Sequence, residues 1–438
     1  MTRSGRAVVV GASMGGLLAA RVLADRFDEV VVVERDTLPA TQQPRRGVPQ
    51  GRHTHLLLGR GREVLEQHFP GFTSEVVDRG ALVGDLTGRG RVFIRGGFLT
   101  SFDSGLDCVC ASRPLLEQVV RERVMAMGNV RVLDGTDTLG LRAVADRVTG
   151  VRTRRRDAPD EQVLDADLVV GAAGRAAASV GWATELGYPA PTQEEIRVDI
   201  TYVSRRYRRR PGDLQGDLFL AVTPEPPGVR AGAVLAQEDD LWIVTLIGYL
   251  GERPPEDADG FRRYAASLPT RAVADLLGDA EPVGEPAVAH FPASRRRRFE
   301  RLATLPEGYL VVADAISSFN PVYGQGMSVA AEESLVLARA LDEGLAGLPR
   351  RFYRAAATVV DMPWTIAASS DLRFPQVPGE RSVQVRLLNA YIARLLTGAR
   401  RDPVLARAFT LTNNLMAGPR SLLRPAIAAR VMVGGSRR

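Results

Sequence analysis

The feature that most constrains this chain is a glycine-rich turn near its start. The turn, Gly11-Ala-Ser-Met-Gly-Gly16, lies between an apolar run at residues 6–10 and an alternating segment at residues 17–24. Four consecutive valines and Glu34 follow. This order predicts a strand, a turn, a helix and a second strand that ends in an acid. Such βαβ units bind dinucleotides, because the turn lets the backbone approach a pyrophosphate and the helix N-terminus attracts its charge.

The same unit supplies most of the expected nucleotide contacts. Glu34 lies eighteen residues after Gly16, where a carboxylate accepts hydrogen bonds from an adenosine ribose. Ser13 replaces the middle glycine of the usual fingerprint and adds a side chain beside the path of the pyrophosphate. The residues that we expect to contact the cofactor share the turn and the end of the second strand: Gly11, Ser13, Met14, Gly15, Gly16, Glu34 and Arg35.

The bulk composition is that of an ordinary globular protein. The chain has 438 residues, of which 45% are hydrophobic and 25% charged, enough for two or three domains with a sizeable core. No eighteen-residue apolar stretch free of charges and prolines is present, so we expect no stable membrane insertion. The first expected strand begins by residue 7 and leaves no room for a signal peptide. The expected location is therefore the cytoplasm.

The basic residues and the cysteines have simple interpretations. The sequence contains no lysine, so all 57 basic residues are arginines, and the net charge is +6. Three arginine clusters at residues 154–156, 205–210 and 295–298 lack the repeated aromatic residues of a nucleic-acid-binding module, so we expect solvated turns and strand ends rather than a nucleic-acid surface. Cys108 and Cys110 lie two apart on an expected strand, which favours small buried apolar side chains over a disulfide or a metal site.

Later segments show that the nucleotide-binding part is split. Buried strands are expected at 167–170 and 309–313; the second is followed by Asp314 and by a helix that opens at Gly326. Residues between these strands alternate like an antiparallel sheet, with strands expected at 196–207, 217–222, 232–237 and 241–248. After residue 350 the chain is expected to be mostly helical, with interruptions at Pro363, Pro375, Pro403 and Pro425.

The expected fold class is α/β: a three-layer, Rossmann-like FAD-binding domain, an antiparallel β substrate domain and C-terminal helices. FAD is expected because the chain has one dinucleotide fingerprint and lacks the second that a separate nicotinamide domain requires. We expect the FAD-binding domain to comprise 1–70, 105–180 and 293–345, the substrate domain 71–104 and 181–292, and the C-terminal region 346–438.

Three separated segments resemble the single-component flavin-dependent monooxygenases of the p-hydroxybenzoate hydroxylase fold. They are the Gly11 turn with Glu34, Arg113-Pro-Leu-Leu116, and Ala313-Asp-Ala315 with the loop Pro321–Met327. The resemblance implies that Arg113 reaches FAD and that Asp314 accepts from its ribityl hydroxyls. It places Pro321, Gly324, Gly326 and Met327 beside the isoalloxazine, where the N-terminus of a helix at Gly326 would face the N1–C2=O edge.

A closer resemblance is to the bacterial polyether-type epoxidases. It rests on Gly11–Met14, Gly47–His55, Phe319–Met327 and Asp371–Pro375, and Ser13 fits this subgroup. In and beside the second segment we expect Arg46 and Gln50 to contact the cofactor. Arg52 is the alternative to Arg46. Either arginine could equally be a surface charge without a role in binding. His53 and His55 either contact flavin and substrate or are structural. The family usually has an aspartate within residues 171–175, where this chain has Gly-Ala-Ala-Gly-Arg.

The resemblance implies a reaction and leaves its substrate open. NAD(P)H would reduce FAD, O2 would add to form a C4a-hydroperoxide, and its distal oxygen would pass to an alkene of a hydrophobic polyketide or terpenoid-like metabolite. Hydroxylation of a phenolic polyketide is the alternative, and it gains from a base that the sequence does not identify. A prenyl-chain reductase and a non-catalytic flavin-binding protein are further alternatives. The resemblance disfavours halogenation, because halogenases of this fold rely on an active-site lysine and this chain has none.

The sequence assigns no catalytic residue and no metal ligand. Substrate size is expected to depend on the strands near Tyr202, Phe219 and Trp242. The C-terminal helices, including Trp364 and residues 371–375, are expected either to cover one side of the substrate cavity or to be plain core packing.

Overall fold

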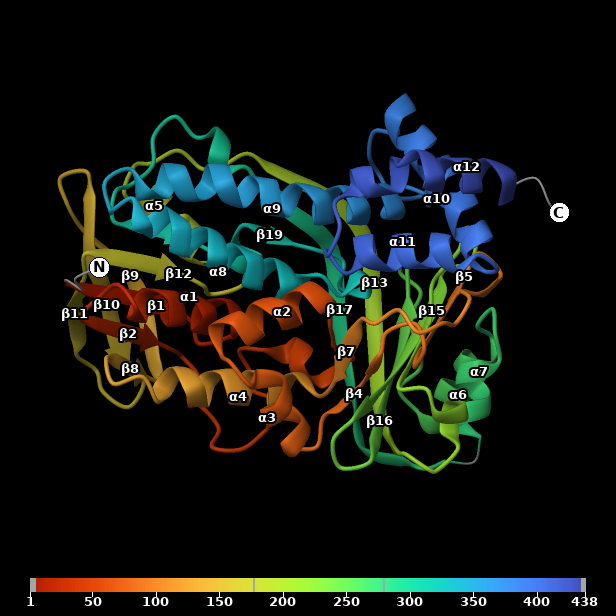
Figure 1. Cartoon of the computed structure of the whole chain (residues 1–438). Helices are drawn as coiled ribbons and strands as arrows, with labels where there is room; N and C mark the ends of the chain where they lie inside the picture. Colours follow the sequence, from red (N-terminus) through yellow and green to blue (C-terminus); the bar gives the residue numbers. More distant parts are fainter. Residues whose placement is uncertain (1–4, 176–177, 279, 435–438) are drawn as a thin grey trace.

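The computed structural model describes residues 5–175, 178–278 and 280–434. A five-stranded parallel sheet in the order β18-β12-β1-β2-β8 forms the centre of one half (Figure 1). Its strands are rich in valine because both faces are buried. The expected strand–turn–helix–strand unit is confirmed at its centre. The strands are β1 (Arg6–Val10), β2 (Glu29–Val33), β8 (Val130–Leu133), β12 (Leu168–Gly171) and β18 (Tyr309–Val311).

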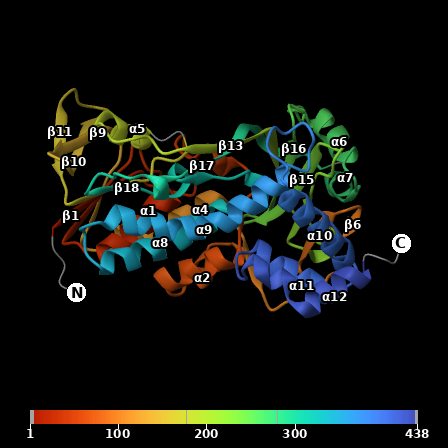
Figure 2. The same ribbon diagram turned by 90° about the horizontal axis from the view of Figure 1, so that it is seen from above.

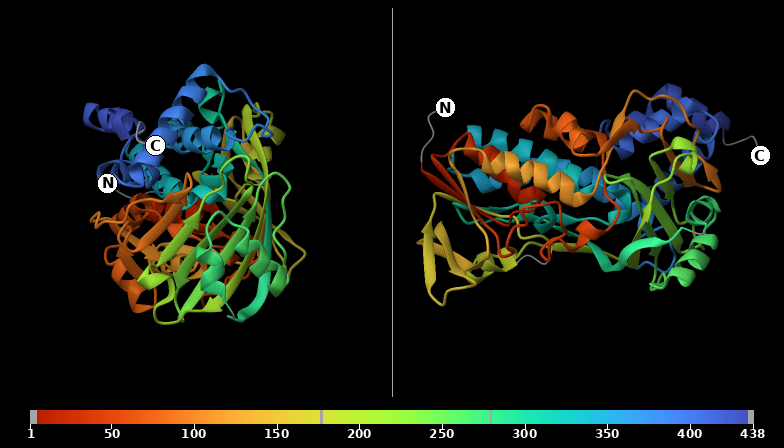
Figure 3. Two further views of the ribbon diagram at one scale, coloured as in Figure 1. Left: turned by 90° about the vertical axis from the view of Figure 1, so that its right-hand side faces the viewer. Right: turned by 90° about the horizontal axis from the view of Figure 1, so that it is seen from below.

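This half has three layers, as expected. Helices cover one face of the sheet, and a small antiparallel sheet contacts β2 and β12 on the other (Figures 2 and 3). The small sheet consists of β9 (Thr136–Val144), β10 (Arg147–Arg155) and β11 (Glu161–Asp165). The helices of this half are α1 (Met14–Ala24), α2 (Gly59–His68), α3 (Phe72–Asp78), α4 (Arg113–Met125), α5 (Ala178–Glu185), α8 (Gly326–Asp342) and α9 (Leu348–Asp371).

The other half is built on an eight-stranded sheet in the order β19-β17-β13-β16-β15-β14-β5-β6. The expected antiparallel arrangement holds for every pair except β14 and β5, which are parallel. The exception arises because β5 comes from a distant part of the chain, and no hairpin connects it to β14. The strands are β5 (Gly90–Ile94), β6 (Gly97–Phe98), β13 (Gln193–Arg208), β14 (Phe219–Val222), β15 (Arg230–Gln237), β16 (Leu241–Gly248), β17 (Pro282–Arg297) and β19 (Ser317–Ser318).

The expectation that the arginine clusters are solvated is wrong for three side chains. Arg205, Arg296 and Arg297 are buried. Arg296 forms an ion pair with Asp361 over 2.6 Å between Nη1 and Oδ1, and Arg297 donates to the carbonyl oxygen of Ala315 at 2.8 Å. Arginine tolerates burial where its guanidinium is paired in this way. The cluster at 295–298 therefore joins the large sheet to the rest of the molecule.

Helices complete the second half. Helices α6 (Ala258–Ala266) and α7 (Ala272–Leu277) pack on the large sheet, and α10 (Val383–Ala399), α11 (Pro403–Asn413) and α12 (Pro425–Gly434) lie together at the end of the molecule (Figure 1). The expected interruption at Pro363 is wrong, because this residue lies inside α9. A proline removes one backbone donor, and here the buried helix continues past it. Pro403 and Pro425 begin helices, as proline at a first helical position does.

The remaining short elements connect the two halves. A three-stranded sheet consists of β3 (Leu56–Leu57), β7 (Asp107–Cys110) and β4 (Leu82–Asp85). Cys108 and Cys110 lie on β7, buried and unbridged, as expected. No helix of the described ranges is long and apolar enough to cross a membrane. The 3-10 helices are η1 (Pro49–Arg52), η2 (Asp213–Gly216), η3 (Phe299–Arg301), η4 (Ala313–Ala315), η5 (Pro321–Tyr323) and η6 (Pro419–Leu423).

The glycine turn leaves no room for a side chain at Gly16. A Cβ added there would lie 1.9 Å from the carbonyl oxygen of Gly11. We expect Gly16→Ala to lower the free energy of unfolding by about 1–3 kcal/mol, the usual cost of overpacking, in urea titrations. Gly181 of α5 is the matched control, because a Cβ there meets nothing within 4 Å. Gly181→Ala should raise stability by roughly 0.5–1 kcal/mol, and a loss as large as that of Gly16→Ala would contradict this reading.

Candidate active site

One cavity of about 1520 Å³ connects the two halves of the molecule. At one end it is lined by the glycine turn, and at the other by the inner face of the large sheet and by α9 to α11. The sequence-predicted residues line it together, although they come from segments more than 300 residues apart. From the expected set the lining includes Gly11, Ser13, Met14, Gly15, Glu34, Arg35, Arg46, Gln50, Arg113, Asp314, Pro321, Gly324, Gly326 and Met327, whereas Gly16 lies behind the turn.

At the nucleotide end, Glu34 supports the turn. Its Oε2 accepts from the backbone N–H of Ala12 at 2.8 Å, and its Oε1 accepts from that of Asp36 at 3.0 Å. The carboxylate also forms an ion pair with Arg45 over 3.1 Å. Glu34 is therefore held rigidly at the end of β2.

Arg45 is the residue that the sequence reasoning missed in this region. Its side chain is only 6% exposed and lies among the carboxylates of Glu34, Asp36 and Glu117. Burial by itself would lower the pKa of Arg45, but these three charges outweigh it and raise the pKa. Arg46, the expected contact, is exposed at the rim of the cavity. Arg45 and Arg46 are adjacent in the sequence, and the sequence does not show which of the two points inward.

Ser13 and Arg113 are brought together as part of one network. Arg113 Nη2 donates to Ser13 Oγ at 3.1 Å and to Glu117 Oε2 at 3.3 Å, and Ser13 Oγ donates to the same Glu117 oxygen at 3.2 Å. The network joins the first turn of α1 to the first turn of α4. The N-terminus of α1 and the buried guanidinium of Arg113 therefore lie together at the cavity, an arrangement that attracts an anion.

Asp314 lies where β18 ends. The preceding residue, Ala313, has a φ of +58°, and its N–H donates to Glu333 Oε2 at 2.6 Å. Burial raises the pKa of Glu333 to about 8 and also raises that of Asp314, whereas the charges of Arg113 and Arg175 oppose the shift at Asp314. Both carboxyl groups thus stand close to the end of the strand.

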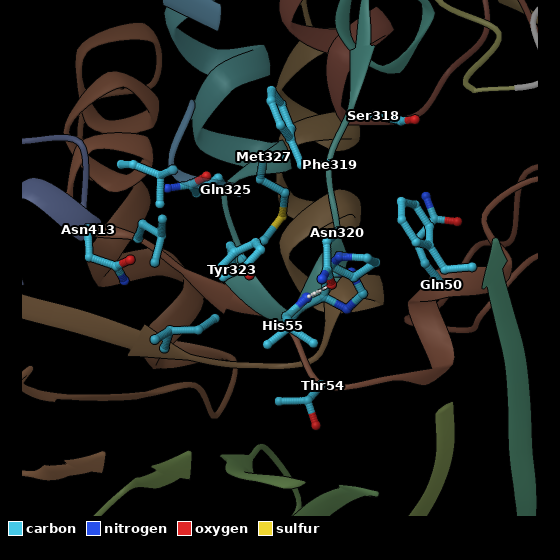
Figure 4. Close-up of a pocket in the computed structure, with 18 of the residues that line it drawn as sticks. Gln50, Thr54, His55, Ser318, Phe319, Asn320, Tyr323, Gln325, Met327 and Asn413 are labelled. Atoms are coloured by element: carbon cyan, nitrogen blue, oxygen red, sulfur yellow. Dashed lines mark hydrogen bonds between the residues drawn. The ribbon is translucent and has the colours of Figure 1, made fainter. Parts of the chain in front are cut away.

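The loop from Phe319 to Met327 forms the wall in the middle of the cavity (Figure 4). Gly324 adopts a left-handed φ of +67°, and α8 begins two residues later with no side chain of the described residues capping it. Gln325 is 1% exposed, and neither atom of its amide has a hydrogen-bond partner within the described chain. Buried amides are normally paired, so this one is free to bind a polar partner such as a water molecule or a ligand.

Asp371, from the last segment of the epoxidase resemblance, supports this loop from behind. It is fully buried, and its Oδ1 accepts from Asn320 Nδ2 and from the Tyr323 hydroxyl, both at 2.9 Å. Its Oδ2 has no partner among the residues described. Burial raises the pKa of Asp371 to about 7. The sequence marked the segment, but only the structure shows that it holds the loop.

The two histidines line the cavity and are partnered. His53 Nδ1 lies 2.8 Å from Ser204 Oγ, and His55 Nδ1 lies 3.0 Å from the carbonyl oxygen of His53. Burial lowers the pKa of His53 to about 4 and that of His55 to about 3, so both rings are neutral at neutral pH. The sequence left open whether these histidines are structural or contact a ligand. Both are held by hydrogen bonds, and both line the cavity.

Of the three residues named for the substrate end, Tyr202 and Phe219 line the cavity and Trp242 does not. The indole of Trp242 donates to Asp213 Oδ2 at 2.8 Å and packs with the core under α6 and α7. Successive side chains of a strand point to opposite faces, and Trp242 is on the outer one. Likewise Trp364 packs in the main core, while other residues of α9 line the cavity.

The comparisons with known proteins agree with this geometry. Residues 5–351 match the family model described as "FAD binding domain". The chain belongs to this family. Its flavin-binding domain therefore contains the glycine turn, Asp314 and the start of α8. Protein Rv3254 of Mycobacterium tuberculosis is 33% identical to it over 434 residues, covering 94% of this chain and 91% of the relative.

Solved structures of low identity share the fold. A flavoprotein/dehydrogenase from Cytophaga hutchinsonii superposes with a TM-score of 0.72 at 13% identity, covering 99% of this chain and 100% of that one. PqsL, described as a probable FAD-dependent monooxygenase from Pseudomonas aeruginosa, superposes with a TM-score of 0.62 at 19% identity, covering 85% and 99%. The expected fold class is confirmed.

The buried carboxyl of Asp371 should make stability depend on pH. Its pKa in the folded chain, about 7, exceeds its ordinary value, so folding favours the protonated form. The stabilisation is complete at low pH and is lost as the pH rises toward 7. From about pH 5 to about pH 7.5, the wild type should lose about 2 kcal/mol of unfolding free energy relative to Asp371→Asn. Asp342→Asn, at an exposed site on α8, should show no such difference.

The orientation of the large sheet predicts which aromatic residue controls substrate size. Phe219→Ala should change the product distribution with substrates of different length, because the ring lines the cavity. Trp242→Ala should cost about 3–5 kcal/mol of stability but leave the distribution unchanged. Mass spectrometry of products from the folded variants checks this. A changed distribution for Trp242→Ala alone would show that our assignment of the two faces is wrong.

Proposed function

We propose that this protein is an FAD-dependent monooxygenase that uses NAD(P)H and O2 to oxygenate a large apolar substrate. One observation carries the proposal. A single cavity joins the dinucleotide turn, the loop before α8 and the inner face of the large sheet. Its volume exceeds the roughly 300–1,000 Å³ of an ordinary small-molecule pocket, and so offers room for a cofactor and a substrate together.

The residues of the nucleotide end fit FAD. The pyrophosphate would lie at the turn Gly11–Gly16 beside Arg113, and the ribose would meet Glu34. The ribityl chain would meet Asp314, and the isoalloxazine would lie along Pro321, Gly324, Gly326 and Met327. The unpartnered Gln325 amide and the open N-terminus of α8 support this placement, because both offer polar groups that need a partner.

FAD, once bound and reduced by NAD(P)H, supplies the oxygen-activating chemistry. The chain's own part is positioning. The helix dipole and N–H groups of α8 favour negative charge on the ring edge that they face. Asp371 holds Asn320 and Tyr323 in place, and the surrounding apolar side chains exclude water. Residues 172–175 of the altered segment line the cavity without the family's usual aspartate, so reduction by NAD(P)H would rely on other groups.

Among oxygenations, we favour epoxidation of an alkene in a polyketide or terpenoid-like metabolite, which needs no protein base. The depressed pKa values of His53 and His55 make both rings poor bases for a phenol at neutral pH. Phenol hydroxylation is the second candidate, and the hydrogen-bonded run from His53 through Ser204 to Thr245 favours it, since it could hold a hydroxyl. Halogenation is disfavoured, because the sequence contains no lysine to serve as the active-site lysine of the halogenases of this fold.

The experiment is a stepwise flavin assay. The purified chain is titrated with FAD, reduced anaerobically with NADPH or NADH, and mixed with O2 and either a polyene or a phenolic polyketide. Monooxygenation predicts bleaching of bound flavin and substrate-dependent oxygen uptake, with one oxygen atom gained by the product. Bound flavin that never bleaches would favour a non-catalytic protein. A saturated product without oxygen uptake would favour a reductase.

Asp314 provides a direct test of the cofactor's position. Asp314→Asn should weaken FAD binding roughly 10- to 100-fold in fluorescence titration, since a hydrogen bond to a charged group contributes about 1.5–3 kcal/mol. Asp342→Asn is the control, because that carboxylate ends α8, pairs with Arg26 and does not line the cavity. Equal FAD affinity in both variants would place the ribityl chain elsewhere.

A further inference from the structure

The C-terminal helices carry the positive charge of the whole protein. Residues 381–434 contain nine arginines and one acidic residue, Asp402. The complete chain has a net charge of only +6, so the remaining sequence is close to neutral. This separation differs from the rest of the surface, where arginines alternate with carboxylates.

Most of these arginines are exposed and lack a carboxylate partner. Only Arg430 forms an ion pair within the described residues, with Asp402 at 2.8 Å. A run of unpaired guanidinium groups attracts a polyanionic surface. The exposed arginines of this segment are Arg386, Arg394, Arg401, Arg407, Arg420, Arg424 and Arg430.

Large exposed apolar side chains belong to the same C-terminal segment as these arginines. Leu387 on α10 is 65% exposed and Leu423 at the end of η6 is 62% exposed; Val383, Leu388 and Met432 are exposed as well. They are not needed for packing, because α10 to α12 have a buried core of their own that includes residues such as Leu395 and Leu405. We call these five apolar residues and the seven arginines the C-terminal patch.

The cavity reaches the surface at this patch. Leu388, Arg420 and Leu423 line the cavity and are also exposed. The patch lies at the end of the molecule formed by α10, α11 and α12, away from the five-stranded sheet (Figures 1 and 3). The substrate end of the cavity therefore opens between apolar side chains and arginines.

We propose that the C-terminal patch docks on the surface of an anionic lipid bilayer. The leucines, valine and methionine would enter the boundary between headgroups and acyl chains, and the arginines would pair with lipid phosphates. This is attachment in the plane of the membrane, not spanning. Substrate delivery rests on the proposed function: the open end of the cavity would receive an apolar substrate directly from the lipid phase.

The charge and the apolar side chains of the C-terminal patch favour an anionic bilayer over a second copy of the chain and over an acidic protein. A second copy meeting the same patch about a two-fold axis would place one set of arginines against an identical set, which repel. An acidic protein would match the charge, but the apolar side chains at the cavity opening match an environment that dissolves hydrocarbon. A bilayer that contains anionic lipid satisfies both features.

The test is flotation of the full chain, loaded with FAD, with lipid vesicles. We expect it to float with equal phosphatidylglycerol and phosphatidylcholine, to float far less with phosphatidylcholine alone, and to lose binding as salt rises. A triple variant should partition onto the anionic vesicles about a hundredfold more weakly than the wild type. Its substitutions are Arg386→Gln, Arg420→Gln and Arg424→Gln. Leu387→Ser with Leu423→Ser should also reduce it. Val144→Ser with Val163→Ser, exposed on the small sheet, is the matched control and should bind normally.

Several results would overturn the proposal. The first is a wild-type chain that does not float with phosphatidylglycerol vesicles. The second is a control variant that loses as much binding as the patch variants. The third is a dimer, detected by light scattering, that dissociates in the variant carrying Leu387→Ser with Leu423→Ser; this would identify a second copy as the occupant. The fourth is binding to an acidic acyl carrier protein without binding to vesicles, which would identify a protein partner. Flotation requires no turnover, so its failure is distinguishable from failure of the monooxygenase proposal.

Discussion

The structure depends on one close contact, between the glycine turn and the end of β18. A Cβ at Gly15 would lie 2.7 Å from the Cβ of Ala313, and one at Gly16 would collide with the turn itself. Two helix N-termini, those of α1 and α8, can therefore approach the same volume from segments 300 residues apart. Their aligned dipoles and free N–H groups make that volume attractive to an anionic cofactor.

Buried carboxyl groups hold this arrangement from behind. Glu333 accepts the N–H of Ala313, which keeps the strand end in its left-handed conformation, and Asp371 binds Asn320 and Tyr323 of the loop that follows. Burial raises the pKa of both acids, to about 8 and about 7. The frame of the flavin site is thus built from groups that resist ionisation, and it is most stable when they are protonated.

The substrate half has a different construction. A large, mostly antiparallel sheet presents one face to the cavity and the other to α6 and α7, so a residue's position in the strand decides its role. Phe219 and Tyr202 face the cavity, while Trp242 stabilises the outer core. The C-terminal helices close the remaining side, and their own small core leaves basic and apolar side chains free to meet a partner.

The sequence by itself determined the nucleotide half to a large extent. Glycine spacing, valine runs and an acid at a strand end are local patterns, and each follows from sterics and hydrogen bonding within a few residues. It also determined which segments belong to the cavity, through the resemblance of Phe319–Met327 and Asp371–Pro375. Only the tertiary structure decided that Arg45 rather than Arg46 turns inward, that β5 pairs parallel to β14, that Arg296 is buried, and that Trp242 faces away. Those outcomes depend on which residues from distant parts of the chain pack against each of these side chains and strands. A local sequence pattern does not contain that information.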